Sequence, residues 1–248
     1  MKLLALDTAA TSCSVALLTD AGLLETRLEA ERVQAETLLP MVEKLLAEAG
    51  LSLRSLDAVA FGRGPGAFTG LRVAAAVTQG LAYGAGLPVV PVSNLAALAA
   101  AAHTRHGAEY ILACLDARMQ EVYWAAYQVR GDSLVPSVQG RPGDSMAPSG
   151  QGRLGDSLEV LAQECLSPPG ELNPPPGAPW FGAGSGWDAY PEALKARVPG
   201  LQGVDGTLTA AAGDIARLAY SAFRQGSIVS PEQAIPVYLR DNVATPKL

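Results

Sequence analysis

The stretch "KLLALDTAATSCSVALLTDAG" (residues 2–22) sets the fold class. Its first apolar run stops at Asp7, small residues follow, and a second apolar run begins near Ser14, which predicts two strands joined by a turn. The same order returns in "ILACLDARMQEVYWAAYQV" (residues 111–129), where Asp116 stands in the place of Asp7. Two copies of a strand-turn-strand indicate a duplicated architecture, with a chance likeness between two short hairpins as the alternative.

The elements around the two copies predict an α/β fold. Strands are expected at residues 23–29, at residues 57–62 and from residue 87, and helices at residues 33–49, 69–83, 94–102 and 209–224. Ser93 or Asn94 is expected to cap the helix over residues 94–102. Strands that alternate with helices in this way form a sheet covered by helices.

Two lobes are predicted. The first comprises residues 1–108 and is joined by a C-terminal helix at residues 207–226, and the second, smaller lobe comprises residues 109–206. A segment rich in proline and glycine, residues 129–180, is expected to be mostly exposed loop.

Three tandem units of twelve residues begin inside this segment. They read "VRGDSLVPSVQG", "RPGDSMAPSGQG" and "RLGDSLEVLAQE", and each contains Gly-Asp-Ser. The middle unit is expected to lack a core of its own. The third is expected to become a helix capped by Asp156 or Ser157.

The composition restricts the function classes. Hydrophobic residues make up 49% of the 248 residues, which predicts a sizeable core, and the net charge of −6 argues against a free-standing nucleic-acid binder. The three cysteines, Cys13, Cys114 and Cys165, lie in or near apolar runs and are expected to be buried, reduced thiols. The first residues are interpreted as a strand and not as a signal peptide. No apolar run approaches the roughly 20 residues of a membrane span, so a cytoplasmic protein is expected.

A glycine-rich loop precedes the second predicted helix, in "FGRGPGAFTGLRVAAAVTQG" (residues 61–80). Gly62, Gly64 and Ala67 fit a degenerate dinucleotide-binding pattern, but Pro65 interrupts the turn and no acidic residue ends the next strand. The Gly-Lys-Ser/Thr of a P-loop does not occur. The loop is therefore a weak predictor of a nucleotide site.

Catalytic residues and metal ligands are not predicted. The two histidines, His103 and His106, fall at the end of a predicted helix or in the loop after it, where the helix dipole favours them. No G-x-S-x-G is present, and no cysteine has a candidate base near it in sequence.

The two turns that follow Asp7 and Asp116 differ in the size of their side chains. In the actin, hexokinase and Hsp70 class, two such turns hold the phosphates of ATP, and small residues let backbone N–H groups approach the anion. The first turn qualifies as a vestigial phosphate turn through Asp7, Thr8, Thr11 and Ser12. The second contains bulky residues, Arg118 to Glu121, and Glu121 would repel phosphate. These turns predict a two-lobe actin-like fold with a degenerate nucleotide cleft; an ATP-dependent sugar-kinase-like enzyme on the same fold is the alternative.

Four motifs in the same order resemble the TsaB (YeaZ) family: "LALDTAATSCSVAL", "GRGPGAFTGLR", "LDARMQEVYWA" and "PVYLRDNVA". The resemblance covers most of the chain and is weakest at residues 129–180. It implies a non-catalytic subunit for bacterial tRNA threonylcarbamoyladenosine (t6A) synthesis, inactive alone. It also implies pairing with the catalytic paralogue TsaD and the ATPase TsaE, a homodimer when alone, and at most indirect contact with tRNA. ATP and metal would belong to the partners.

The resemblance also implies an interface. The helix over residues 69–83 is apolar on nearly every side and so needs two surfaces to bury against. One is its own sheet, and the other would be a partner's helix, with the helix over residues 33–49 alongside. Burial wholly inside one lobe is the alternative. The implied interface residues are Leu38, Met41, Val42, Leu45, Arg63, Phe68, Arg72, Val73 and Val77.

Two further roles are disfavoured. The paralogue binds metal through a helical His-x-x-x-His, and Gln34 and Leu38 stand at that spacing here, so this chain is not expected to hold the metal. A protease that acts on the paralogue would need a nucleophile–base pair, and the sequence does not indicate one.

Overall fold

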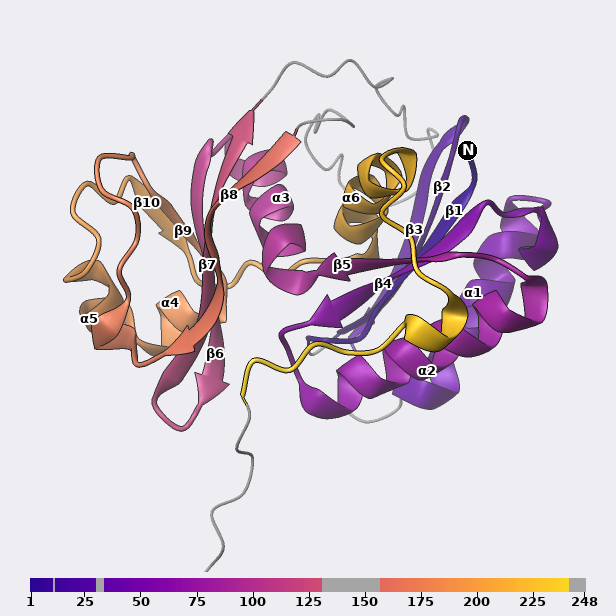
Figure 1. Cartoon of the computed structure of the whole chain (residues 1–248), viewed down its shortest axis with the longest axis horizontal. Helices are drawn as coiled ribbons and strands as arrows, with labels where there is room; N and C mark the ends of the chain where they lie inside the picture. Colours follow the sequence, from indigo (N-terminus) through magenta and orange to yellow (C-terminus); the bar gives the residue numbers. More distant parts are fainter. Residues whose placement is uncertain (11, 30–33, 131–156, 241–248) are drawn as a thin grey trace, which may run out of the picture.

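A computed structural model describes residues 1–10, 12–29, 34–130 and 157–240 and forms two five-stranded mixed sheets (Figure 1). The first sheet has the order β3-β2-β1-β4-β5. Its strands are β1 (Leu3–Asp7), β2 (Ser12–Thr19), β3 (Gly22–Glu29), β4 (Ala58–Gly64) and β5 (Val89–Ser93). Every residue of β1 is buried, because helices cover both faces of this sheet, and its apolar run is therefore continuous.

The second sheet repeats the topology of the first. It has the order β10-β9-β6-β7-β8 and comprises β6 (Tyr110–Arg118), β7 (Glu121–Arg130), β8 (Ser157–Ser167), β9 (Phe181–Ala183) and β10 (Gly203–Asp205). β6 to β8 are antiparallel as β1 to β3 are, and β9 and β10 run parallel to β6 as β4 and β5 run parallel to β1. The predicted duplication, and with it the two-lobe actin-like α/β fold, is confirmed.

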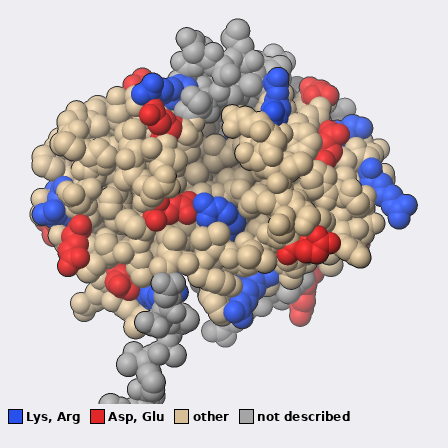
Figure 2. Space-filling model, in the orientation of Figure 1, with Lys and Arg blue, Asp and Glu red and all other residues tan. Residues whose placement is uncertain are grey.

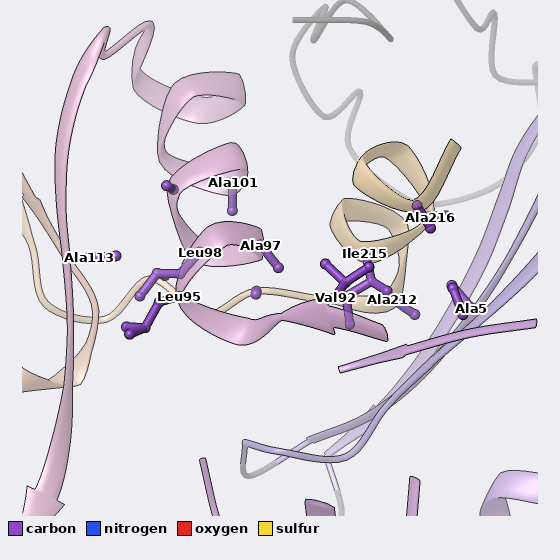
Figure 3. Packing of buried hydrophobic residues seen from close by; sticks show 14 of the residues in the cluster. Ala5, Val92, Leu95, Ala97, Leu98, Ala101, Ala113, Ala212, Ile215 and Ala216 are labelled. Carbon is purple, nitrogen blue, oxygen red and sulfur yellow. The ribbon is translucent and has the colours of Figure 1, made fainter. Parts of the chain in front are cut away.

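Two helices lie between the sheets, α3 (Asn94–His106) and α6 (Ala212–Arg224) (Figure 1). α3 follows β5 of the first sheet but packs mainly on β6 and β7, and α6 follows β10 of the second sheet but packs on β1 and β2. Figure 3 shows Leu95 and Leu98 of α3 directed toward the second sheet, and Ala97 directed toward Ile215 of α6. The two halves thus exchange helices and share one core.

The remaining helices cover the outer faces. On the first sheet these are α1 (Gln34–Glu48) and α2 (Phe68–Ala85), and on the second they are α4 (Ser185–Ala189) and α5 (Pro191–Lys195) (Figure 1). Short 3-10 helices occur at Leu53–Ser55, Pro169–Glu171 and Pro231–Gln233. None of the described helices has the length and hydropathy needed to cross a membrane.

The predicted helix at the third twelve-residue unit is wrong, because Ser157–Ser167 forms β8 and pairs antiparallel with β7. Its apolar side chains divide between the two faces of the sheet: Leu158 packs into the core between the sheets, whereas Leu161 and Cys165 pack into the core on the outer face. A helix with one apolar stripe could not reach both cores. Tertiary pairing with β7 therefore decides the conformation.

The prediction that residues 129–180 are mostly exposed loop is wrong for the part that the structure describes. Besides β8, this part contains the buried side chains of Leu172 and Trp180. Residues 131–156, which include the middle Gly-Asp-Ser unit, lie outside the described residues. The predicted lobe boundaries remain a proposal, with the first sheet built from strands before α3 and the second from strands after it.

Candidate functional site

A cleft of about 1440 Å³ lies between the two halves of the molecule. Asp7 at the end of β1 and Asp116 near the end of β6 both line it, and Arg72 and Arg240 contribute positive charge. On the face shown in Figure 2, the basic and acidic side chains of the described residues are interspersed over both halves. The cleft corresponds to the predicted nucleotide cleft.

Asp7 is held by internal hydrogen bonds at the floor of this cleft. Its side chain is 2% exposed, and its Oδ1 accepts from Asn94 Nδ2 at 2.8 Å and from the Ala9 N–H at 3.4 Å. Burial raises the pKa of Asp7 to about 6, although the hydrogen bond from Asn94 opposes that rise. Asn94 Oδ1 accepts from the Gly64 N–H at 2.7 Å, so one amide side chain joins Asp7 to the glycine loop.

The sequence did not predict this role for Asn94. It offered Asn94 only as one of two candidate helix caps, and the cap is Ser93, whose Oγ accepts from the Ala96 N–H at 3.1 Å. The pairing joins residues 87 positions apart, so no local pattern indicates it.

The glycine loop packs on the first turn. The Ala67 N–H donates to the Ala9 carbonyl at 2.9 Å, and Thr8 Oγ1 donates to the Gly70 carbonyl at 2.6 Å. A Cβ added at Gly66 would lie 2.8 Å from both Cβ and the carbonyl oxygen of Ala9, so only glycine permits this approach. The loop thus holds the turn in place. Of the other predicted phosphate-turn residues, Ser12 is buried at the start of β2 and Thr11 lies outside the described residues.

The second turn is exposed and strained. Arg118, Met119 and Gln120 have φ of 61°, 57° and 60°, a left-handed conformation that costs about 1–2 kcal/mol for each residue with a Cβ. The Asp116 carboxylate accepts from the Arg118 N–H at 2.8 Å and pairs with the Arg118 guanidinium at 3.0 Å. The Arg118 amide is therefore directed to Asp116 and not to a ligand in the cleft.

A C-terminal segment, residues 235–240, crosses from the first half to the second; we name it the C-terminal strap. The Val237 N–H donates to the Arg63 carbonyl at 2.7 Å, and Arg240 pairs with Glu121 beside the second turn. The sequence contained this segment in the motif "PVYLRDNVA" but indicated no role for it.

The implied interface residues fall into two groups. Leu38, Val42 and Leu45 are at most 2% exposed and pack on their own sheet, Met41 is half-buried, and Arg63 pairs with Glu164 of β8 at 3.1 Å. The second group lies on one exposed side of α2. We name this side the α2 face; it surrounds a shallow hollow of about 370 Å³ and comprises Phe68, Thr69, Arg72, Val73, Ala76 and Val77.

One side of α2 is exposed and the opposite side is buried. Phe68 is 46% exposed, and the Arg72 guanidinium lies 3.9 Å from the centre of its ring. Val73 and Val77 are half-buried, whereas Ala74 and Ala82 on the opposite side are fully buried. The alternative of a helix wholly buried inside one lobe does not hold for this chain by itself.

Two of the cysteines are buried, and both histidines have a hydrogen-bond partner within the protein. Burial raises the thiol pKa of Cys13 and Cys114, which disfavours the reactive thiolate. His103 Nδ1 lies 2.8 Å from the Ala108 carbonyl, and His106 pairs with Asp205 at 2.9 Å. Within the described parts of the chain, no group of three or more His, Cys, Asp or Glu residues is placed to hold a metal ion.

Comparison with known proteins places the chain among tRNA-modification proteins. The family described as "TsaD: tRNA N6-adenosine threonylcarbamoyltransferase" matches residues 28–248. The tRNA threonylcarbamoyladenosine biosynthesis protein TsaB of Escherichia coli (strain K12) is 39% identical over 100% of this chain and 98% of its own. The protein of the same name from Haemophilus influenzae is 38% identical over 100% of this chain and 97% of its own.

Solved structures of the same family have a similar fold. YeaZ from Pseudomonas aeruginosa is 42% identical, has a TM-score of 0.80 and covers 96% of this chain and 99% of its own. A second structure from Pseudomonas aeruginosa, described as an uncharacterized protein with similarity to peptidase YEAZ, has a TM-score of 0.82 at the same identity and coverage. Full-length similarity in sequence and in fold leads to one conclusion: this chain belongs to the TsaB (YeaZ) family.

Proposed function

We propose that this chain is the non-catalytic subunit of the complex that makes t6A in tRNA. It pairs with the catalytic paralogue TsaD and supports the transfer of threonylcarbamoyl to the adenosine beside the anticodon. The observation that carries the proposal is the full-length similarity to TsaB, together with the match to the transferase family over residues 28–248.

The cleft favours a non-catalytic role over the sugar-kinase alternative. Asp7 is bound to Asn94, the amide of Arg118 is bound to Asp116, and the hydroxyl of Thr8 is bound to the Gly70 carbonyl. In a working ATPase of this class, groups in these two turns would face the phosphates. Here they hold the turns and the glycine loop together, so ATP and the metal are expected to bind to the partners.

The α2 face is the proposed docking surface for TsaD, and for a second copy when the chain is alone. It is mostly apolar and partly exposed, and its small side chain at Ala76 permits close approach of another helix. Phe68, Arg72, Val73 and Val77 supply it, whereas Leu38, Val42 and Leu45 are buried in the core of the first sheet. TsaE is proposed to bind the assembled pair, in the cytoplasm, with at most indirect contact between tRNA and this chain.

Reconstitution tests this function. TsaD, TsaE and the enzyme that supplies threonylcarbamoyl-adenylate are incubated with unmodified tRNA, with and without this chain, and t6A is measured by mass spectrometry after digestion. We expect t6A to form only when the chain is present, and the chain alone to modify nothing. Equal t6A formation without the chain would refute the proposal. ATP-dependent phosphorylation of a sugar by the isolated chain would instead support the alternative.

A further inference from the structure

We propose that the C-terminal strap couples the α2 face to the second turn of the cleft, so that an event at the docking surface changes the far side of the cleft. The docking role of the α2 face rests on the proposed function. The coupling itself is a property of the isolated chain.

The first half of the molecule holds the strap through backbone and side-chain contacts. The Val237 N–H donates to the Arg63 carbonyl at 2.7 Å, and a Cβ added at Gly64 would lie 2.8 Å from the Val237 carbonyl oxygen. Just before the strap, the Ala234 carbonyl accepts from Gln79 Nε2 of α2 at 3.1 Å. The strap therefore follows the glycine loop closely, with glycine providing the space.

The second half holds the end of the strap through one side chain. Arg240 pairs with Glu121, donates to the Arg118 carbonyl at 3.3 Å and contacts Met119 Sδ at 3.2 Å. Its side chain is 13% exposed. Arg240 therefore contacts the same turn that adopts the left-handed conformation, and its charge-assisted hydrogen bonds favour that conformation.

The strap forms no helical or β-sheet hydrogen bonds, so the contacts of Val237, Tyr238 and Arg240 fix its position. Residues 235–240 belong to neither a helix nor a strand. A segment held by a few hydrogen bonds on each side opens locally at a low free-energy cost, so loss of the bonds on one side loosens the rest. The position of Arg240 thus depends on the contacts made by the residues before it.

Tyr238 connects this unit to the α2 face. Its hydroxyl accepts from Arg72 Nε at 3.1 Å, and its ring lies 5.4 Å from the ring of Phe68. Tyr238 is 43% exposed and Ile235 is 62% exposed, so a partner that covers the α2 face also meets the strap. One residue, Leu239, separates Tyr238 from Arg240, and a shift of Tyr238 is transmitted along the backbone to the second turn.

Hydrogen exchange on the isolated full-length chain tests the coupling without any partner. Tyr238→Ala removes the contact with the α2 face, and Tyr83→Ala, at a 72% exposed tyrosine further along α2, is the matched control. We expect amides of residues 118–123 to exchange about tenfold faster in Tyr238→Ala, as expected when a hydrogen bond to a charged group is lost, and at the wild-type rate in Tyr83→Ala. Unchanged exchange at residues 118–123 in Tyr238→Ala would overturn the coupling.

Arg240→Gln identifies the residue through which the coupling acts. It is expected to raise exchange at residues 118–123 by about the same factor, and its combination with Tyr238→Ala to add little, because both changes break one connection. The exposed Arg54→Gln is the control. Full additivity of the two changes would overturn a common route through the strap. Wild-type exchange in α3 and β6 of each variant shows that the protein is folded.

A second measurement adds TsaD. If TsaD binds and protects the α2 face, exchange at residues 118–123 is expected to change in the wild-type chain and not in Arg240→Gln. Binding without any change at the turn would refute the coupling to the partner. Failure of TsaD to bind would refute the proposed function and the proposed effect of TsaD on the second turn. The connection inside the isolated chain is tested separately, by hydrogen exchange in Tyr238→Ala.

Discussion

Asp7 has a buried carboxyl group in a protein whose other buried residues are mostly apolar. Its ordinary pKa of 3.8 rises to about 6 in the folded state because burial disfavours the charged form. The folded protein therefore retains this proton when the unfolded chain has lost it. The contribution of Asp7 to stability is full below about pH 3.8, and it is lost as the pH rises through about 6.

Asp7→Asn is expected to reveal this dependence, because asparagine keeps an oxygen for Asn94 but has no proton to lose. The free energy of unfolding of the variant minus that of wild type should increase by about 2 kcal/mol between about pH 4 and about pH 7. Urea unfolding at both pH values measures it. An equal difference at the two pH values would show that Asp7 is not perturbed.

Thr78 of α2 contains a buried hydroxyl without a hydrogen-bond partner. Among the described residues, every other buried side-chain oxygen or nitrogen has one. Its side chain is 0% exposed. A buried hydroxyl without a partner costs about 1–3 kcal/mol, so Thr78→Val should raise the free energy of unfolding by about 1 kcal/mol. Urea unfolding measures this, with the half-buried Thr104→Val of α3 as the control for helix propensity. A loss of stability in Thr78→Val relative to that control would contradict it.

The glycine loop packs against the first turn. Because Gly66 lies so close to Ala9, a larger residue at position 66 should not fit. Gly66→Ala should destabilise the protein by about 1–3 kcal/mol, because backbone atoms must move to admit the methyl group. Gly84→Ala, in α2 with open space around it, should stabilise by about 0.5–1 kcal/mol. Thermal unfolding of both variants checks the contrast. A neutral Gly66→Ala would mean that the loop does not pack on the turn as described.

Most elements could be predicted from local patterns. The apolar runs around Asp7 and Asp116 predicted β1, β2, β6 and β7. Apolar periodicity predicted α1 and α6, and alanine-rich runs predicted α2 and α3. β8 could not be predicted, because its side chains serve two cores and its conformation depends on pairing with β7. Such dependence on a distant strand is not visible in a single segment.

The site residues that the sequence did not predict are those whose contacts join distant parts of the chain. Asp7 and the glycine loop were predicted from motifs, but Asn94 contacts Asp7 across 87 positions and Arg240 contacts Glu121 across 119. The predicted interface residues formed one set in the sequence, apolar side chains together with Arg63 and Arg72. Packing divides that set, because one side of α2 faces the sheet and the other faces solvent.

The most direct test of the proposed role is light scattering on a sizing column, with the chain alone and with TsaD of the same genome. The wild-type chain should form a homodimer alone and a heterodimer with TsaD. Val77→Glu should abolish both, because it places a charge in the apolar α2 face, and Val204→Glu, at an exposed valine of β10, should pair as wild type does. A Val77→Glu variant that still binds TsaD, or a wild-type chain that never does, would contradict the account.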